Sequence, residues 1–117
     1  MLALRKIEAT YGLSLAEIEP PGQPGPGEVL VEVVATGICG SDISIESWAE
    51  GYRAFMARAL PVTLGHETVG KVIALGAGVT RPTLGATVVI NPAVACGSCA
   101  RCRLGDAVGC TDRKPSA

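Results

Sequence analysis

Short apolar stretches, broken by glycine and proline, follow one another along the whole chain. The clearest is the valine-rich segment 28–36, in which Glu28 and Glu32 are the only charged residues. β-Branched side chains of this kind favour a strand. Further strands are predicted at 1–7, 13–18, 67–75 and 84–91. Many short strands with glycine punctuation are typical of a closed or partly closed β barrel.

Helical patterns are short and few. After the strand that ends at Gly37, we expect Ser41 or Asp42 to cap a short helix, because their side-chain oxygens can accept a hydrogen bond from the first helical turn. The segment 48–60 is compatible with a second helix, which Pro61 would end. The fold class predicted from these elements is therefore mainly β, with short helices.

Size and charge restrict the function classes. The chain has 117 residues, a 48% apolar composition and a formal net charge of −1, which predicts one globular domain over residues 1–117. No stripe of Lys and Arg is available to neutralise phosphates, so nucleic-acid binding is not expected. The apolar runs are too short to cross a membrane, and the first residues do not resemble a signal peptide. We expect a cytoplasmic protein with a small-molecule partner.

Four cysteines near the end of the chain have the spacing of a metal site. The segment from 96 to 110 reads C-x2-C-x2-C-x7-C, with its thiols at Cys96, Cys99, Cys102 and Cys110. Four thiolates close a tetrahedral zinc shell and leave no position for water, as in structural zinc sites. The surrounding segment, about 95–112, has little apolar content of its own, so metal would replace a core there.

Disulfides and an iron–sulfur cluster fit the same four cysteines less well than zinc does. Two disulfides would need an oxidising compartment, and the total of five cysteines is odd. An iron–sulfur run opens in the same way, but its fourth cysteine follows after three residues and precedes proline. Here the fourth cysteine follows after seven residues and precedes Thr111. Zinc binding is the favoured interpretation of the four cysteines. An iron–sulfur cluster, disulfides and inert thiols are the alternatives.

A second constellation lies upstream, where Cys39 and the only histidine, His66, offer a thiolate and an imidazole. Zinc favours both ligands, and Glu67 would add an oxygen ligand or support the site from outside. Asp42 is a candidate to accept the second ring N–H of His66, and Ser41 a candidate to pass on a proton. On residue type alone, a structural histidine and a small buried cysteine are the commoner interpretation.

The order of these motifs resembles a known family. G-I-C-G-S-D at 37–42, G-H-E-x-x-G at 65–70 and the four-cysteine segment occur in the order found in the N-terminal, GroES-like catalytic domain of zinc-containing medium-chain alcohol dehydrogenases. The resemblance covers nearly the whole chain. It implies a GroES-like, partly open β barrel with short helices and a zinc-binding loop lobe. The stretch I-S-I-E-S-W after Asp42 is similar to the threonine and polyol dehydrogenase branch.

The resemblance also implies roles for the residues. Cys39 and His66 would ligate a catalytic zinc with Glu67 beside it, Ser41 would begin a proton relay, and Asp42 would orient His66. A structural zinc would be held by Cys96, Cys99, Cys102 and Cys110. In the family the catalytic zinc polarises an alcohol oxygen, and hydride passes to NAD or NADP bound by a following Rossmann domain.

Several features of the family pattern are missing. No G-x-G-x-x-G fingerprint is present, so we expect the cofactor domain, a third zinc ligand and the last part of the catalytic domain to lie outside these residues. Ser44 stands where many relatives have a relay histidine, and L-G-A-T-V at 84–88 replaces the usual G-D-R-V.

These motifs allow two interpretations of the function. The first is the catalytic-domain portion of a zinc-dependent NAD(P) alcohol or polyol dehydrogenase, inactive as an isolated chain and completed by a Rossmann-domain partner. The alternative is a non-enzymatic zinc-binding module that retains only the structural lobe. Self-association through exposed apolar surface is a further expectation.

Overall fold

Strands dominate the architecture. The computed structural model describes residues 1–115, in which three antiparallel sheets are formed. The first has the order β2-β1-β4, with β1 at Leu2–Lys6, β2 at Ser14–Glu17 and β4 at Val62–Thr63. The second has the order β3-β5-β6, with β3 at Val29–Gly37, β5 at Glu67–Leu75 and β6 at Thr87–Val89. The third pairs β7 at Ala93–Val94 with β8 at Lys114–Pro115.

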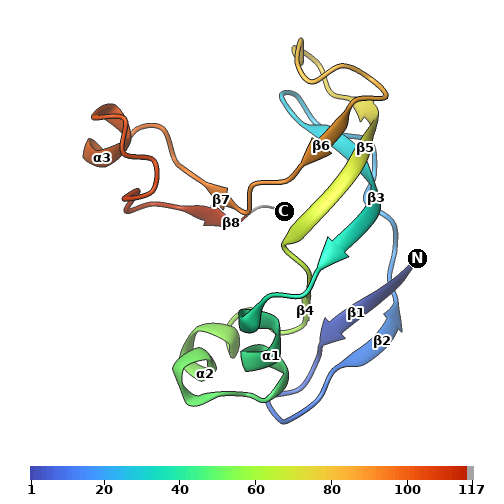
Figure 1. Ribbon diagram of the computed structural model, residues 1–117, viewed down its shortest axis with the longest axis vertical. Helices are drawn as coiled ribbons and strands as arrows, with labels where there is room; N and C mark the ends of the chain where they lie inside the picture. Colours follow the sequence, from blue (N-terminus) through green and yellow to red (C-terminus); the bar gives the residue numbers. More distant parts are fainter. Residues whose placement is uncertain (116–117) are drawn as a thin grey trace.

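Three short helices occupy the connections. Helices α1 (Gly40–Glu46) and α2 (Glu50–Met56) follow each other between β3 and β4, and they lie beside the first sheet (Figure 1). Helix α3 (Ala100–Arg103) lies in a loop lobe between β7 and β8. The lobe extends to one side of the sheets (Figure 1). Among residues 1–115, no helix is long and apolar enough to cross a membrane.

The pairing of β3 with β5 forms the largest ladder. Each strand has nine residues, and their register runs from Val29 opposite Leu75 to Gly37 opposite Glu67. Two irregularities interrupt it, after Leu30 and after Val33. Burial alternates along β5, as expected for a sheet that is covered on one face only.

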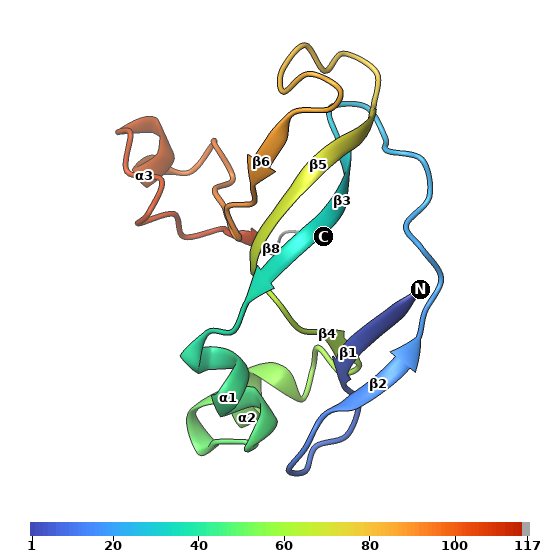
Figure 2. The same cartoon turned by 45° about the vertical axis from the view of Figure 1, so that its right-hand side comes forward.

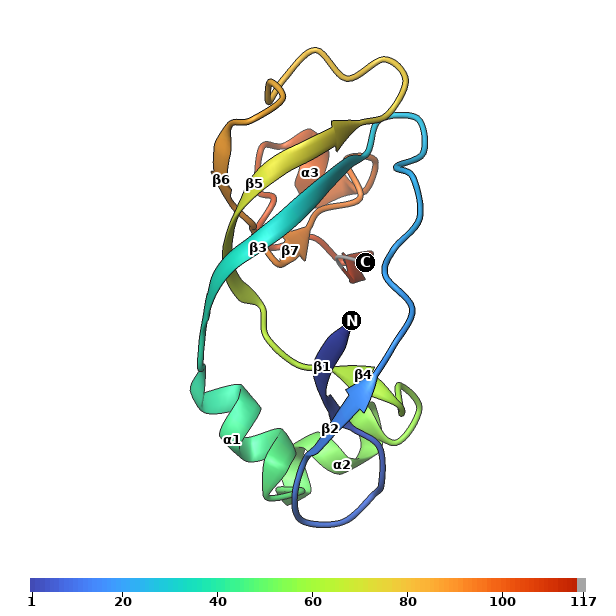
Figure 3. The ribbon, with the colours of Figure 1, turned by 90° about the vertical axis from the view of Figure 1, so that its right-hand side faces the viewer.

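The sheets remain open to a large extent. The radius of gyration is 15.8 Å, whereas roughly 13 Å is expected for a compact chain of this length. Few apolar side chains are buried in the described residues: Ala3, Met56, Val72 and Cys110. Figures 2 and 3 show the two larger sheets as separate units, with the chain between β2 and β3 passing along one side. The predicted partly open, mainly β fold is confirmed.

Most predicted elements are present with shorter bounds. All five predicted strands occur, and 67–75 agrees in both ends, whereas 84–91 contracts to the three residues of β6. The second helix spans only Glu50–Met56 of the predicted 48–60. Strands β4, β7 and β8 and helix α3 were not predicted, because two to four residues carry no measurable periodicity.

The predicted cap of the first helix was wrong. The N-cap is Cys39, not Ser41 or Asp42. Asp42 is instead the third helical residue, and its carboxylate accepts a hydrogen bond from the Cys39 backbone N–H at 2.9 Å. This is the reciprocal bond of a capping box, so an acidic residue stabilises the helix start from one turn further along.

Two glycines give a matched test of the fold. Gly70 lies on β5 where an added Cβ would collide with the Glu32 carbonyl and a Val31 methyl, so Gly70→Ala should lower the free energy of unfolding by about 1–3 kcal/mol. Gly51 lies exposed in α2 with nothing within 4 Å of an added Cβ. Gly51→Ala should therefore raise stability by about 1 kcal/mol. Urea denaturation at fixed zinc measures both, and equal stability of the two variants would contradict the described β3–β5 contact.

Candidate metal centres

The β3–β5 ladder brings two distant residues together. Gly37, the last residue of β3, is paired with Glu67, the first residue of β5. Cys39 lies two residues beyond the end of β3, and His66 immediately precedes β5. Because the strands are antiparallel, the exit from one and the entry to the other lie at the same end of the sheet. The register therefore places the Cys39 thiol beside the His66 ring.

Three potential ligand atoms converge there. The Cys39 sulfur, a His66 ring nitrogen and a Glu67 carboxylate oxygen all lie within 4.8 Å of one another. Zinc bonds of about 2.0–2.3 Å separate tetrahedral ligands by roughly 3.3–3.8 Å, so small inward movements suffice to hold an ion. Cys39 and His66 are half-buried and Glu67 is exposed. Three protein ligands with one side accessible is the donor set of an open zinc site.

Asp42 lies against both Cys39 and His66. One carboxylate oxygen accepts the Cys39 backbone N–H, and the other lies 3.6 Å from His66 Nδ1. That second oxygen, Oδ1, is buried and has no hydrogen-bond partner within residues 1–115. A buried acceptor without a donor is costly, and a small rotation of the His66 ring would satisfy it. The contact fits the predicted orienting role, which stays a prediction.

The two nearby serines differ in their surroundings. Ser41 Oγ lies 3.4 Å from His66 Nε2, the nitrogen opposite the one that faces Asp42. Ser44 Oγ instead donates to the Gly40 carbonyl at 3.1 Å, one turn back in its own helix. Ser41 is therefore the hydroxyl that belongs to the candidate centre.

The protonation of the pair is coupled. A hydrogen bond from the Ser41 side chain, with further help from its backbone and from His66, lowers the pKa of the Cys39 thiol. The hydrogen bond with Cys39 raises the pKa of His66, with the Asp42 and Glu67 charges adding to the effect. The surroundings thus favour a thiolate, the form that binds metals. The imidazole must lose its proton before it can act as a ligand.

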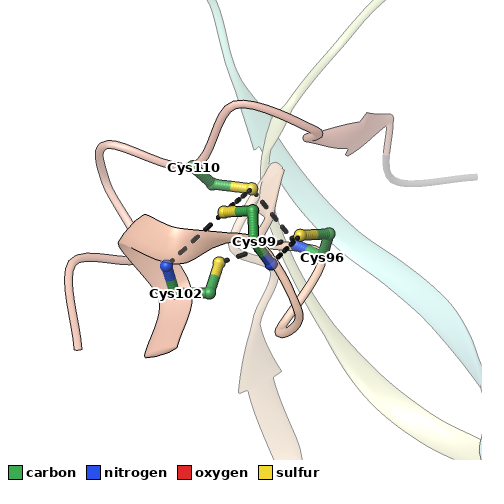
Figure 4. Close-up of side chains that lie close together, drawn as sticks. All are labelled: Cys96, Cys99, Cys102 and Cys110. Atoms are coloured by element: carbon green, nitrogen blue, oxygen red, sulfur yellow. Dashed lines mark hydrogen bonds between the residues drawn. The ribbon is translucent and has the colours of Figure 1, made fainter. Parts of the chain in front are cut away.

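The four lobe cysteines form a second cluster (Figure 4). Cys96 and Cys102 have their sulfurs 3.9 Å apart, and the sulfurs of Cys99 and Cys110 are 4.0 Å apart. A tetrahedron with zinc–sulfur bonds of about 2.3 Å has edges of roughly 3.8 Å. A disulfide requires a separation of about 2.05 Å, and all five cysteines of the chain are free. The four sulfurs therefore fit one zinc ion with little adjustment.

Backbone amides surround these sulfurs. The Cys96 amide lies 3.3 Å from the Cys110 sulfur, the Cys99 amide 3.3 Å from that of Cys96, and the Cys102 amide 3.5 Å from that of Cys99. Such donors stabilise thiolates, because each one places a partial positive charge beside the sulfur. Three of the four sulfurs, those of Cys96, Cys99 and Cys110, therefore have a backbone donor that favours the thiolate form.

An acidic residue organises the long gap before the last cysteine. Asp106 accepts a hydrogen bond from Gly109 N at 2.8 Å and forms an ion pair with Arg101 at 3.2 Å. These contacts fold the seven-residue spacer back onto helix α3. Sequence reasoning missed Arg101 and Asp106, although an aspartate three residues before a glycine is a recognisable turn signal.

Comparisons with known proteins identify the family of this chain. The family profile of the alcohol dehydrogenase GroES-like domain matches residues 25–116. The chain belongs to this family. Within it, the predicted resemblance to zinc-containing medium-chain alcohol dehydrogenases is confirmed, and the fold is that of the GroES-like domain.

Three similar proteins illustrate the relationship. The L-threonine 3-dehydrogenase of Pyrococcus abyssi is 39% identical over 114 residues, which cover 97% of this chain and 32% of the relative. A structure of a short chain alcohol dehydrogenase from Escherichia coli CFT073, complexed with NADH, has a TM-score of 0.79 at 35% identity and covers 99% of this chain and 32% of that one. The alcohol dehydrogenase of Aeropyrum pernix has a TM-score of 0.82 at 28% identity, with coverages of 99% and 33%. The chain spans about a third of the length of the relatives it matches.

The lobe geometry predicts an order of thiol reactivity in metal-free, reduced protein. Hydrogen bonds from the Cys102 and Thr111 backbones lower the pKa of Cys99 to about 6, whereas burial raises the pKa of Cys102 to about 12. At pH 7 Cys99 is mostly thiolate and Cys102 is thiol, so iodoacetamide should modify Cys99 first. Peptide mass spectrometry after brief labelling measures this order. Equal labelling of both residues would contradict the described hydrogen bonds, and zinc-loaded protein provides the protected control.

Proposed function

We propose that the chain is the catalytic-domain portion of a zinc-dependent NAD(P) alcohol or polyol dehydrogenase. The observation that carries the proposal is the convergence of Cys39, His66 and Glu67 at one end of the β3–β5 ladder, in a member of the GroES-like dehydrogenase family. Such a three-ligand site leaves a position for substrate, unlike the four-cysteine lobe.

The proposal assigns roles to the residues of this centre. Cys39 and His66 hold zinc, with Glu67 as a further oxygen ligand or as a neighbouring charge. A bound zinc ion supplies Lewis acidity, which makes the hydroxyl of an alcohol easier to deprotonate. Ser41 would begin the proton relay: its hydroxyl oxygen would accept that proton while its own hydroxyl proton passes on to solvent, since the hydroxyl lies beside His66 Nε2. Asp42 holds the His66 ring by its other nitrogen and fixes which nitrogen is free to bind.

The lobe has a separate, structural role in the proposal. Its zinc is held by Cys96, Cys99, Cys102 and Cys110, whose sulfur separations suit a single tetrahedral ion better than a disulfide. With four thiolates no position remains for a substrate. The free thiols fit a reducing, cytoplasmic setting.

The cofactor and partner follow from the relatives. One similar structure is complexed with NADH, and the relatives are about three times as long as this chain. We therefore assign NAD or NADP to a separate Rossmann-type domain. Large apolar side chains such as Leu15, Val34 and Val89 are mostly exposed in this chain, and such surface suits a partner. Self-association is the competing use of the same surface.

The substrate is a small alcohol or polyol. The L-threonine 3-dehydrogenases among the relatives make a secondary alcohol of the threonine type the first compound to test. The alternative function, a zinc-binding module without catalysis, has one observation in its favour: the lobe has its full set of four ligands within residues 96–110, whereas the third potential ligand of the open centre is the exposed Glu67.

Metal content distinguishes the two functions. We expect two zinc ions per chain by elemental mass spectrometry, falling to one in Cys39→Ser and to one in Cys110→Ser. The two variants serve as controls for each other, because each removes a ligand from a different cluster. One zinc in the native chain, unchanged by Cys39→Ser, would favour the zinc module over the dehydrogenase.

Activity is tested in a chimera. This chain replaces the corresponding first third of the Pyrococcus abyssi L-threonine 3-dehydrogenase, and alcohol-dependent reduction of NAD⁺ is followed by its absorbance. We expect activity with the native chain and background rates with Cys39→Ser, whose lobe zinc should be retained. A chimera that holds both zinc ions and oxidises none of a panel of small alcohols and polyols would contradict the proposed function.

A further inference from the structure

A lysine is buried in the first sheet without an acidic partner. The Lys6 side chain has an exposed fraction of 0%, and within residues 1–115 it forms no salt bridge. Its ammonium donates to the backbone carbonyls of Thr10, Gly12 and Glu46, the last two at 3.0 and 2.9 Å. These three bonds use every donor of the group. The Trp48 ring lies over the same ammonium, with its centroid 5.3 Å away.

Trp48 itself has an unusual backbone. Its φ of +54° is the only positive φ at a non-glycine residue in the described part of the chain. Trp48 N donates to the Ile45 carbonyl and Ala49 N to the Ser44 carbonyl, which is the Schellman arrangement at the end of helix α1. This position is usually glycine, because a side chain there is strained. The tryptophan occupies a strained position where its ring covers the Lys6 ammonium.

Lys6 and Trp48 meet at one end of helix α1, and the candidate metal centre lies at the other. The helix has seven residues, its N-cap is Cys39, and its last carbonyl, that of Glu46, accepts bonds from both Lys6 Nζ and Gly12 N. The His66 side of the centre is attached to strand β1, which also carries Lys6. Leu64 N, two residues before His66, donates to the Leu4 carbonyl at 3.0 Å. Strand β1 therefore anchors both sides of the centre.

Packing alone would hold α1 loosely against this strand. A pocket of about 210 Å³, open to solvent, lies between them, with Leu4 on β1, Asp42 and Ile43 on α1, and Leu64 among its lining residues. A helix beside such a space has room to shift, since few side chains fill the contact. The bond from the buried Lys6 ammonium to the Glu46 carbonyl ties the end of α1 to strand β1 in a fixed direction, which an apolar residue of similar volume would not do.

We propose that Lys6 and Trp48 are positioning residues for the Cys39–His66 centre, which they serve by fixing helix α1 on strand β1. This inference rests on the proposed function, because it takes that centre to bind metal. Lys6 acts through the Glu46 carbonyl at the end of α1, and Trp48 holds the ammonium against that carbonyl. The geometry of Cys39 and Asp42 toward His66 then depends on residues that touch neither metal nor substrate.

Cobalt binding tests the proposal. The lobe is first filled with one equivalent of Zn²⁺, and Co²⁺ is then titrated while its visible d–d bands are recorded. Lys6→Met keeps the length of the side chain and removes the charge, and we expect it to weaken Co²⁺ binding by tenfold or more and to change the bands. Arg5→Met is the matched control, since Arg5 donates to the Pro61 carbonyl at 3.0 Å from the same strand and has no described bond to α1. It should leave the cobalt affinity within twofold of the native chain.

Trp48 variants separate positioning from stability. Trp48→Gly relieves the strained backbone and removes the ring, so we expect equal or higher thermal stability together with weaker Co²⁺ binding. Trp48→Phe keeps an aromatic face over Lys6 and should bind Co²⁺ nearly as the native chain does. A purely structural role would move stability and affinity in the same direction.

Two results would overturn the inference. If the folded Lys6→Met and Trp48→Gly proteins bind Co²⁺ with native affinity and native bands, Lys6 and Trp48 do not position the centre. If the native chain itself binds no Co²⁺ beyond its lobe zinc, the proposed function fails at the metal centre and this inference falls with it. Should Lys6→Met fail to fold, the Trp48→Gly titration decides alone.

Discussion

The antiparallel register of β3 and β5 is the constraint on which the candidate centre depends. Gly37 opposite Glu67 makes the exit of one strand coincide with the entry of the other, and Cys39 and His66 lie just beyond that pair. A slip of one residue would turn every side chain of the strand to the opposite face. The one-sided burial of β5 opposes such a slip, so the ordinary physics of a half-covered sheet also fixes the geometry of the site.

Hydrogen bonds fix the position of helix α1, a role that close packing has in a larger domain. Only a few apolar side chains are buried in the described residues, and helix α1 lies beside an open pocket. Its two ends are instead held by polar contacts, Asp42 with the Cys39 amide at the start and Lys6 with the Glu46 carbonyl at the end. Polar contacts of this kind are directional, so they fix where a short helix lies even when little area is buried.

The sequence was informative where spacing carries the chemistry. The cysteine run, the Cys39 and His66 motifs and the valine-rich strand all led to the mainly β, GroES-like fold. The N-cap was wrong, because a cysteine is a rare cap and an aspartate three residues later performs part of its function through the capping box. Lys6 and Trp48 gave no signal, since a lysine at the end of a strand is normally solvated and a positive φ at tryptophan cannot be read from residue type.

The two cysteine-containing sites differ in what they require from the rest of the fold. The lobe draws its four sulfurs from one short segment, and its own backbone amides surround them, so it can form with little help from the sheets. The Cys39–His66 centre joins residues from the start of helix α1 and from the β4–β5 turn. It needs the β3–β5 ladder, the Asp42 carboxylate and strand β1 in their described positions. Damage to the sheets would therefore remove the open centre first and leave the lobe intact. A preserved cysteine lobe is for this reason weak support for catalysis in any chain of this family, whereas an aspartate that binds the cysteine amide and lies against the histidine ring is a far more demanding arrangement.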